Sequence, residues 1–268
     1  MFRRILKIFV YGKLPFFSGC FPYCGERVFF PKDSFIFKMA CEQGVFEQTN
    51  VRLLLSLVKP GTYYFDVGAN IGLMSLPILR SVPDCQVVSF EPSPATGPFL
   101  VKTLKNSSFS SRWQVINEAV GKEVGERDFH VARAGMGAFD GFYKTGRIDA
   151  ESDTIKVRVT TIDAVWEKLG RPEISVMKID VEGAEVEALL GAQRCIATAK
   201  PYLLVEWNLL NSSAAGKIPE DLLKVADDLS YRVYCLPSMV PVTSPSEMAI
   251  QMIFSEDFLL VPKATTHG

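Results

Sequence analysis

Between residues 63 and 208 the sequence alternates short runs of apolar and β-branched residues with longer segments that suit helices. Each run is apolar throughout, which is typical of strands that are covered on both faces. This rhythm predicts an α/β domain in which parallel strands are joined by crossover helices. With 268 residues and a hydrophobic content of 48%, the chain is long and apolar enough to bury one large core. The predicted core strands are residues 63–67, 86–90, 113–118, 176–180 and 202–206.

Further apolar segments predict additional strands. We expect two strands at 126–131 and 155–161, with the glycine-rich stretch 134–146 as the loop between them. After the last core strand, apolar runs at 232–236 and 250–254 are expected to close the sheet as an antiparallel pair. The expected fold is therefore Rossmann-like, with a seven-stranded, mainly parallel sheet, an antiparallel terminal strand and helices on both faces.

The first 44 residues differ in composition from the rest of the chain. They are rich in Phe and interrupted by prolines, so we expect an irregular N-terminal cap before a domain formed by residues 45–268. Residues 1–17 mix four basic side chains with apolar ones, which suits either a short helix lying on a membrane surface or a packed extension. Their uncharged apolar run is far shorter than the roughly 20 residues that span a bilayer.

The segment Tyr-Phe-Asp-Val-Gly-Ala-Asn-Ile-Gly, residues 64–72, runs from a strand through a glycine turn towards a helix. Gly68 permits a tight turn, and Gly72 permits close packing without a Cβ atom. Backbone amides at the start of the helix are expected to hold an anionic ligand group. Asp66 either contacts the ammonium group of a ligand or organises the turn, and an ordinary strand-to-helix connection has the same pattern. Pro77 predicts a kink or an early end of the helix.

A second acidic residue ends the next predicted strand, in Ser-Phe-Glu-Pro at residues 89–92. The Glu91 carboxylate can accept hydrogen bonds from the vicinal hydroxyls of an adenosine ribose, and Pro92 fixes the chain as it leaves the strand. A solvated strand-end glutamate is the alternative. A dinucleotide is disfavoured, because Asn70 stands where the G-x-G-x-x-G fingerprint has its second glycine.

Acidic residues also cluster after the fourth core strand, within residues 177–185. Because ligands of open α/β sheets bind beyond the carboxyl ends of the strands, Asp180, Glu182 and Glu185 are expected near the ligand. One of them can act as general base for a substrate hydroxyl. The same cluster could bind a divalent cation or simply favour a helix N-terminus. We predict no metal site, since no histidine or further acid nearby completes a ligand set.

Four segments, in this order and spacing, resemble the FkbM family of methyltransferases: Asp-Val-Gly-Ala-Asn-Ile-Gly, Phe-Glu-Pro, Thr-Thr-Ile-Asp and Lys-Ile-Asp-Val-Glu-Gly-Ala-Glu. The resemblance covers roughly residues 60–207. It implies a class I fold that binds S-adenosylmethionine and methylates a hydroxyl of a sugar, a glycan or a polyketide-type natural product. The residues implied at the methyl donor are Asp66, Gly68, Ala69, Asn70, Gly72, Glu91, Pro92, Glu118, Ala119 and Asp180.

In the implied reaction, the substrate oxygen attacks the donor's methyl group while a carboxylate accepts the hydroxyl proton. The candidate catalytic acids are Asp180, Glu182 and Glu206. Of these, Glu182 or Asp180 is the preferred base. Thr161 and Asp163 match a family segment that precedes a helix.

Two departures from the family pattern lie near the presumed substrate. Family members often carry small hydroxyl residues where this chain has residues 135–139, and a histidine where it has Trp207 and Asn208. We therefore expect a substrate that differs from those of the best-known members. No catalytic role is expected for His130 or His267.

The charge and the cysteines restrict the partners and the compartment. A net charge of -1 argues against a nucleic-acid partner. The six cysteines are scattered and form no C-x-x-C pair, so we expect reduced thiols in a cytoplasmic protein. A small-molecule or glycan hydroxyl is the expected acceptor. The rival functions are nitrogen methylation of a protein and a non-catalytic, cofactor-binding scaffold.

Overall fold

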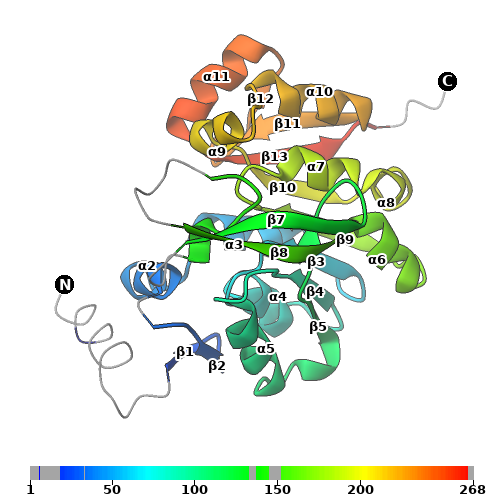
Figure 1. The fold of residues 1–268 in the computed structure, drawn as a ribbon. Helices are drawn as coiled ribbons and strands as arrows, with labels where there is room; N and C mark the ends of the chain where they lie inside the picture. Colours follow the sequence, from blue (N-terminus) through cyan, green and yellow to red (C-terminus); the bar gives the residue numbers. More distant parts are fainter. Residues whose placement is uncertain (1–5, 7–18, 33, 133–136, 145–151, 265–268) are drawn as a thin grey trace.

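The computed structural model describes residues 6, 19–32, 34–132, 137–144 and 152–264. An eight-stranded sheet, in the order β12-β11-β13-β10-β9-β3-β4-β5, runs through the described part of the chain (Figure 1). Five neighbouring strands are parallel, and the other three continue the sheet in antiparallel order. The parallel strands are β3 (Tyr63–Val67), β4 (Gln86–Phe90), β5 (Trp113–Ile116), β9 (Ile174–Ile179) and β10 (Tyr202–Glu206). The alternation of the sequence therefore predicted the parallel core correctly.

The antiparallel end of the sheet differs from the prediction. It consists of β11 (Tyr231–Cys235), β12 (Val240–Val242) and β13 (Asp257–Pro262), so the sheet has one strand more than expected. The strand predicted at 250–254 was wrong, because these residues end helix α11 (Pro245–Phe254). Met248 and Met252 are buried at a helical spacing of four residues, and the Ser244 side chain caps the helix.

Helices cover both faces of the sheet, as expected. Alternate residues of β3 belong to different cores, since Tyr64 packs on one face and Phe65 on the other. The helices in the Tyr64 core are α2 (Phe35–Gln43), α3 (Gln48–Leu57), α4 (Ser75–Ser81) and α5 (Gly97–Lys105). The helices in the Phe65 core are α6 (Ile162–Lys168), α7 (Glu185–Leu190), α8 (Gln193–Ala199), α10 (Glu220–Asp228) and α11. Short helices η1 (Ser110–Arg112) and α9 (Leu209–Ala214) complete the connections.

The predicted kink at Pro77 does not occur, because helix α4 begins at Ser75 and not directly after Gly72. Pro77 is thus the third helical residue. A proline is tolerated in the first turn, where backbone N–H groups have no partner within the helix.

A separate three-stranded sheet lies against the main one. Its strands, β6 (Ala119–Val120), β8 (Ser152–Thr160) and β7 (Gly125–Ala132), are arranged in that order, and β7 pairs with β8 in antiparallel fashion. This pair confirms the two additional strands that the sequence predicts. The expected loop between them lies partly outside the described residues, but it includes the short helix η2 (Gly137–Phe139).

The described part of the N-terminal segment is more regular than expected. Strands β1 (Cys20–Tyr23) and β2 (Glu26–Phe29) form an antiparallel hairpin, followed by α2. The rings of Phe30 and Phe37 stack at 3.9 Å and are buried in the same core as the residues of α3 and α4. The segment is therefore packed onto the domain. Residues 1–5 and 7–17, on which the membrane prediction rests, lie outside the described part.

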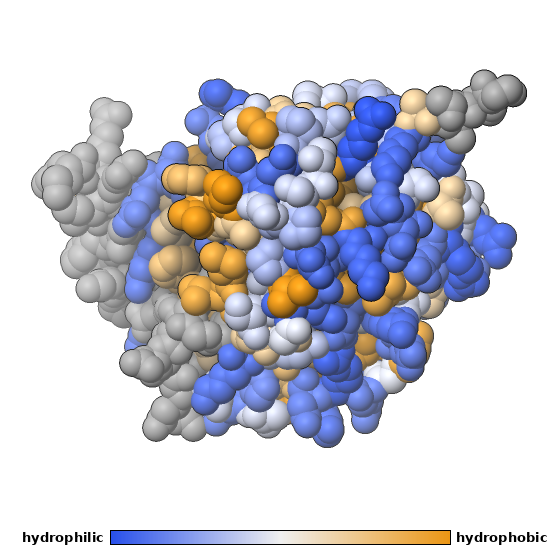
Figure 2. All heavy atoms as spheres, turned by 90° about the horizontal axis from the view of Figure 1, so that it is seen from above, coloured by the Kyte–Doolittle hydropathy of each residue, from blue (hydrophilic) through white to orange (hydrophobic). Residues whose placement is uncertain are grey.

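Large apolar side chains are exposed on α9 and α11. Figure 2 shows apolar side chains gathered on one side of the face to which these helices belong. The exposed residues of the two helices are Leu209, Leu210, Ile250, Ile253 and Phe254. Phe254 is 80% exposed. Among the described residues, no helix is long and apolar enough to cross a bilayer. The six cysteines are free thiols.

Candidate active site

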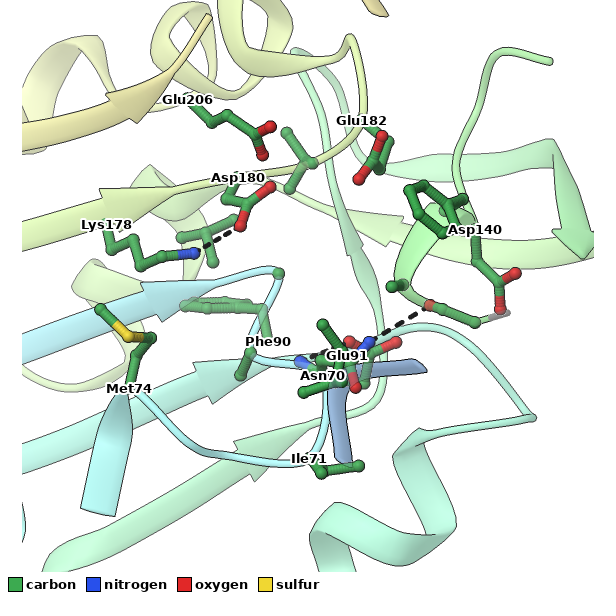
Figure 3. A pocket seen from close by; sticks show the side chains of 18 of the residues that line it. Asn70, Ile71, Met74, Phe90, Glu91, Asp140, Lys178, Asp180, Glu182 and Glu206 are labelled. Carbon is green, nitrogen blue, oxygen red and sulfur yellow. Dashed lines mark hydrogen bonds and ion pairs between the residues drawn. The ribbon is translucent and has the colours of Figure 1, made fainter. Parts of the chain in front are cut away.

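A cavity of about 270 Å³ lies at the carboxyl ends of the parallel strands (Figure 3). Most of the residues implied at the donor or in catalysis line it: Gly68, Ala69, Asn70, Glu91, Pro92, Glu118, Ala119, Asp180, Glu182 and Glu206. Asp66 and Gly72 do not. The fold thus gathers residues that are up to 138 positions apart, from Gly68 to Glu206, around one space.

The glycine turn is shaped by close backbone packing. Gly68 has a φ angle of +85°, and a Cβ atom there would lie 1.7 Å from the carbonyl oxygen of Asp180. Its amide and that of Ala69 both donate to the carbonyl oxygen of Phe90, at 3.1 and 3.0 Å. The expected anion site at a helix start is therefore not formed here, because these amides are used within the turn and the helix begins later.

Asp66 lies behind the turn and is fully buried. Its Oδ2 atom accepts a hydrogen bond of 2.5 Å from the hydroxyl of Ser75, which is 2.8 Å from the hydroxyl of Ser89. The indole N–H of Trp113 donates to the same Ser89 hydroxyl at 2.8 Å. Of the two roles considered for Asp66, these contacts support organising the turn. Burial raises its pKa.

Gly72 serves packing. A Cβ atom at this position would lie 2.9 Å from side-chain atoms of Leu100 and Trp113. The glycine therefore lets the turn approach α5 and β5 and does not itself contact the cavity.

Glu91 is held by three donors. Its Oε2 accepts from the amide of Asn70 at 2.8 Å, and its Oε1 accepts from the amide of Ser93 and the hydroxyl of Thr96, both at 2.9 Å. A carboxylate has about four acceptor positions, so about one remains, on Oε2. Burial raises the pKa of Glu91 to about 7, although the three hydrogen bonds oppose this shift. Asp140, which the sequence analysis missed, receives a 2.5 Å hydrogen bond from Ser93.

The three candidate catalytic acids meet at one edge of the cavity. One oxygen atom of each of Asp180, Glu182 and Glu206 lies within 4.8 Å of the others. Glu182 is buried, with a φ angle of 51°, and its Oε2 accepts from the Asn211 amide at 2.7 Å. Glu206 accepts from the Asn208 amide at 3.1 Å. These three carboxylates can accept a proton or bind a hard cation. The expectation that the site holds no metal stays a prediction.

Lys178 is a site residue that the sequence analysis missed. Its ammonium nitrogen lies 2.6 Å from Oδ2 of Asp180, and the residue is buried on a strand. Burial alone would lower its pKa, but Asp180, Glu47 and Asp66 outweigh burial and raise it. A lysine inside an apolar strand was the available signal, because lysine is rarely buried without a partner.

Glu47 and Asp257 reach the cavity from distant parts of the chain. Glu47 precedes α3 with a φ angle of 45° and accepts a 3.2 Å hydrogen bond from Asn50. Burial raises its pKa to about 7, against the opposing effect of Lys178. Asp257 begins β13, and burial raises its pKa as well. No sequence motif marked either residue.

Aromatic and aliphatic side chains form the remaining walls. Phe35 of α2 and Phe139 of η2 face each other with ring centroids 5.5 Å apart. Other large apolar lining residues are Ile36 and Met39 of α2, Phe46 after it, Phe129 of β7 and Phe142 after η2. The cavity therefore combines an acidic edge with an apolar wall.

Three other residues named from the sequence lie away from the cavity. Glu185 does not line it, contrary to expectation. Its Oε1 accepts from the amides of Val181 and Gly183, so it shapes the loop before α7. The Thr161 side chain caps α6, and Asp163 accepts from the amides of Arg194 and Cys195.

Glu118, the two histidines and the glycine-rich loop are the other positions named from the sequence. Glu118 lies just beyond β5 and forms an ion pair with Arg158 at 3.2 Å. His130 lies on β7, 3.1 Å from the hydroxyl of Thr154, and is not a lining residue. His267 and residues 135 and 136 are outside the described part of the chain.

Two curated relatives match parts of the chain. The AMB antimetabolite synthetase AmbE of Pseudomonas aeruginosa is 25% identical over 204 residues, which is 63% of this chain and 10% of that protein. Methyltransferase 1 of Beauveria bassiana is 25% identical over 145 residues, covering 48% of this chain and 58% of that protein. The matches thus span less than two thirds of either relative.

Two solved structures are similar at low sequence identity. The crystal structure of methyltransferase FkbM from Methylobacillus flagellatus has a TM-score of 0.46 and 17% identity, covering 84% of this chain and 53% of that one. A SAM-dependent O-methyltransferase from Thermotoga maritima has a TM-score of 0.43 and 13% identity, covering 83% and 68%.

The family model described as the methyltransferase FkbM domain matches residues 66–233. This match spans more than half of the 268 residues and includes the glycine turn, Glu91 and the three clustered acids. The chain belongs to the FkbM family of methyltransferases.

Proposed function

We propose that the protein transfers a methyl group from S-adenosylmethionine to a hydroxyl oxygen of a sugar, a glycan or a polyketide-type natural product. The observation that carries this proposal is the group of Asp180, Glu182 and Glu206, whose oxygens converge within 4.8 Å at the edge of the cavity. Hydroxyl methylation requires a proton acceptor beside the reacting oxygen, and carboxylates at a partly buried site can supply it.

The cavity fits an adenosyl ligand. Glu91 has one acceptor position left for a ribose hydroxyl, and Glu118 and Ala119 lie on the wall beyond it. The Gly68 and Ala69 amides are used within the turn and offer nothing to a pyrophosphate. When bound, S-adenosylmethionine supplies an electrophilic methyl group and leaves as a neutral thioether.

Glu182 is the residue that we assign as the base. Asp180 is engaged by Lys178 at 2.6 Å, which leaves it poorly suited to receive a proton. The Glu182 side chain points into the cavity, and the Asn211 amide holds one of its oxygens at 2.7 Å (Figure 3). The hydroxyl proton passes to Glu182 and then to solvent, while the chain aligns the acceptor. No covalent intermediate with the protein is required.

The apolar wall favours an acceptor that has an apolar portion. Phe35, Met39 and Phe139 line the same cavity as the three acids. The exposed apolar residues of α9 and α11 are close in sequence to two lining acids, since Leu209 follows Glu206 and Phe254 precedes Glu256. These features support a polyketide-type acceptor over an unsubstituted sugar.

The decisive experiment measures transfer of a labelled methyl group from the donor into fractionated extract. We expect label in a small molecule or glycan that carries a new methyl ether. The Glu182→Gln variant should lower turnover by roughly 10²- to 10⁴-fold while leaving the affinity for S-adenosylhomocysteine, measured by calorimetry, almost unchanged. Glu123→Gln, at an exposed position, is the matched control.

Three outcomes would contradict the proposal. Near-normal turnover in Glu182→Gln would remove this residue as the base. Label in protein would favour nitrogen methylation. Tight binding of S-adenosylhomocysteine without transfer to any fraction would favour the non-catalytic scaffold.

A further inference from the structure

The lining of the cavity includes three charged residues that the proposed reaction does not use for proton transfer. Lys178 comes from β9, Glu47 from the junction of α2 and α3, and Asp257 from the start of β13. In Figure 3, Lys178 and Met74 lie at one end of the cavity and Glu91 lies towards the other, with Phe90 between them. In this view the apolar side chain of Phe90 thus lies between Lys178 and Glu91.

Acidic side chains outnumber basic ones around Lys178. Among the described residues that line the cavity, Lys178 has the one cationic side chain. Its ammonium nitrogen lies 2.6 Å from a carboxylate oxygen of Asp180. The charge of Glu47 acts on Lys178, and the charges of Lys178 and Asp180 act on Asp257. An ammonium group has three donors, of which the Asp180 contact uses one. The carboxylates of this group can therefore bind one more cation. The ammonium group of Lys178 keeps donors for an anion.

A ligand that carries both an ammonium and a carboxylate on one carbon matches this arrangement. We propose that Glu47, Asp257 and Lys178 form a subsite for an α-amino acid head group, in which Glu47 binds the ammonium and Lys178 the carboxylate. This inference rests on the proposed function, since the methionine portion of S-adenosylmethionine is such a head group. It assigns the methionine end of the donor to these three lining residues and not to Asp66 or Gly72, which do not line the cavity.

The contacts of Glu47 make it suitable for this task. Asn50 donates to its Oε2 at 3.2 Å and fixes the carboxylate, while the residue still lines the cavity. The left-handed backbone, with a φ angle of 45°, turns the chain between α2 and α3 at this residue. The subsite therefore depends on a part of the chain that precedes the residues matched by the family model.

Calorimetry with two ligands tests the assignment. S-adenosylhomocysteine carries the complete head group, and its deamino analogue keeps the carboxylate but lacks the ammonium. In the Glu47→Gln variant we expect the affinity for S-adenosylhomocysteine to fall by roughly tenfold or more, while the affinity for the deamino analogue changes less than about threefold. Glu42→Gln, an exposed acid of the neighbouring helix α2, is the matched control and should leave both affinities unchanged.

A second pair of measurements addresses Lys178. The Lys178→Met variant should weaken binding of S-adenosylhomocysteine, whereas an analogue without the carboxylate should lose little. If Glu47→Gln proves unfolded by circular dichroism, Asp257→Asn provides the same test at the neighbouring acid, with a smaller expected loss for the deamino analogue than for the complete ligand.

The outcomes separate this inference from the proposed function. Equal losses for both ligands in Glu47→Gln would mean that the residue only supports the fold, and no loss would mean that it does not contact the head group. Either result overturns the subsite but not the methyl transfer. Failure of the unmodified protein to bind S-adenosylhomocysteine and S-adenosylmethionine would overturn both.

Discussion

The amide of Asn70 donates to Oε2 of Glu91 at 2.8 Å, so the glycine turn after β3 and the acid after β4 form one unit. Asn70 adopts a φ angle of 50° in this contact, and its side chain donates to the carbonyl oxygen of Gly137 at 3.2 Å. A single residue therefore links the turn, the acid and the η2 segment. Changes at any of the three should affect ligand binding.

Replacing Glu91 with Gln should weaken donor binding. The NH2 group of the new amide would face either the Asn70 donor or the Ser93 and Thr96 donors, and the hydrogen bonds to the remaining oxygen would no longer be charge-assisted. We expect S-adenosylhomocysteine to bind roughly 10- to 100-fold more weakly. Calorimetry with the natural ligand and with its 2′,3′-dideoxy analogue would check this, because an equal loss for both would show that Glu91 does not contact the ribose.

The stability of the ligand-free protein should fall as pH rises through 7. Burial raises the pKa values of Glu47, Glu91 and Glu185 to about 7 from 4.5. Between about pH 4.5 and 7, these three side chains are protonated in the folded protein and ionised in the unfolded chain. Their contribution to stability is therefore complete below about pH 4.5 and is lost as the pH rises through 7. Urea denaturation at pH 5.5 and 7.5 would measure this, and the trend should weaken in Glu185→Gln. An unchanged slope in that variant would refute the assignment.

Gly68→Ala should be severely destabilising. Its Cβ atom would lie 1.7 Å from a backbone oxygen of Asp180, which cannot move without displacing the end of β9. We expect a loss of several kcal/mol in unfolding free energy. Gly61→Ala is the matched control, because Gly61 has a similar φ angle of +75° but open space around it, so its cost should be about 1 kcal/mol. Equal losses in chemical denaturation would rule out the steric explanation.

Asn211→Ala should reduce turnover without weakening donor binding. Asn211 holds Glu182 at 2.7 Å and is itself buried, so its removal frees the base to move. We expect kcat to fall by roughly tenfold or more, with a changed pH profile of kcat. Asn106→Ala, in the exposed segment after α5, should leave both unchanged. A pH profile identical to that of the unmodified protein would show that Asn211 does not position the base.

Chelation should leave methyl transfer unaffected. Lys178 already binds Asp180, and asparagine amides bind Glu182 and Glu206, so a cation would have to compete for these oxygens. Activity after dialysis against EDTA, with and without added Mg²⁺, checks this. Loss of activity that Mg²⁺ restores would assign a cation to the three acids.

The local pattern of the sequence predicted the elements of the fold where one signal dominated. The runs at 63–67, 86–90 and 202–206 coincide with strands because buried parallel strands are apolar throughout. The run at 250–254 misled because a short apolar run does not separate a strand from an amphipathic helix, and here the capping by Ser244 decides.

The site was only partly predictable. Motifs located Glu91, Asp180 and Glu182, which follow directly from strands that the pattern revealed. Glu47 and Asp257 were missed because their place at the cavity depends on how distant elements pack. Asp66 belongs to a recognisable motif, yet its side chain is buried and contacts the turn instead of the cavity. The spacing of a motif does not reveal on which face of the sheet a side chain at the end of a strand lies.

In β10 and β13, Glu206 lies opposite Asp257, so the last strand of the sheet supplies part of the wall around the acids. A ribosome must therefore produce nearly all of the described sequence before the pocket can close, and a nascent chain that ends before residue 257 lacks that wall. Ligand capture during synthesis should accordingly appear late and abruptly, once this strand has emerged and paired.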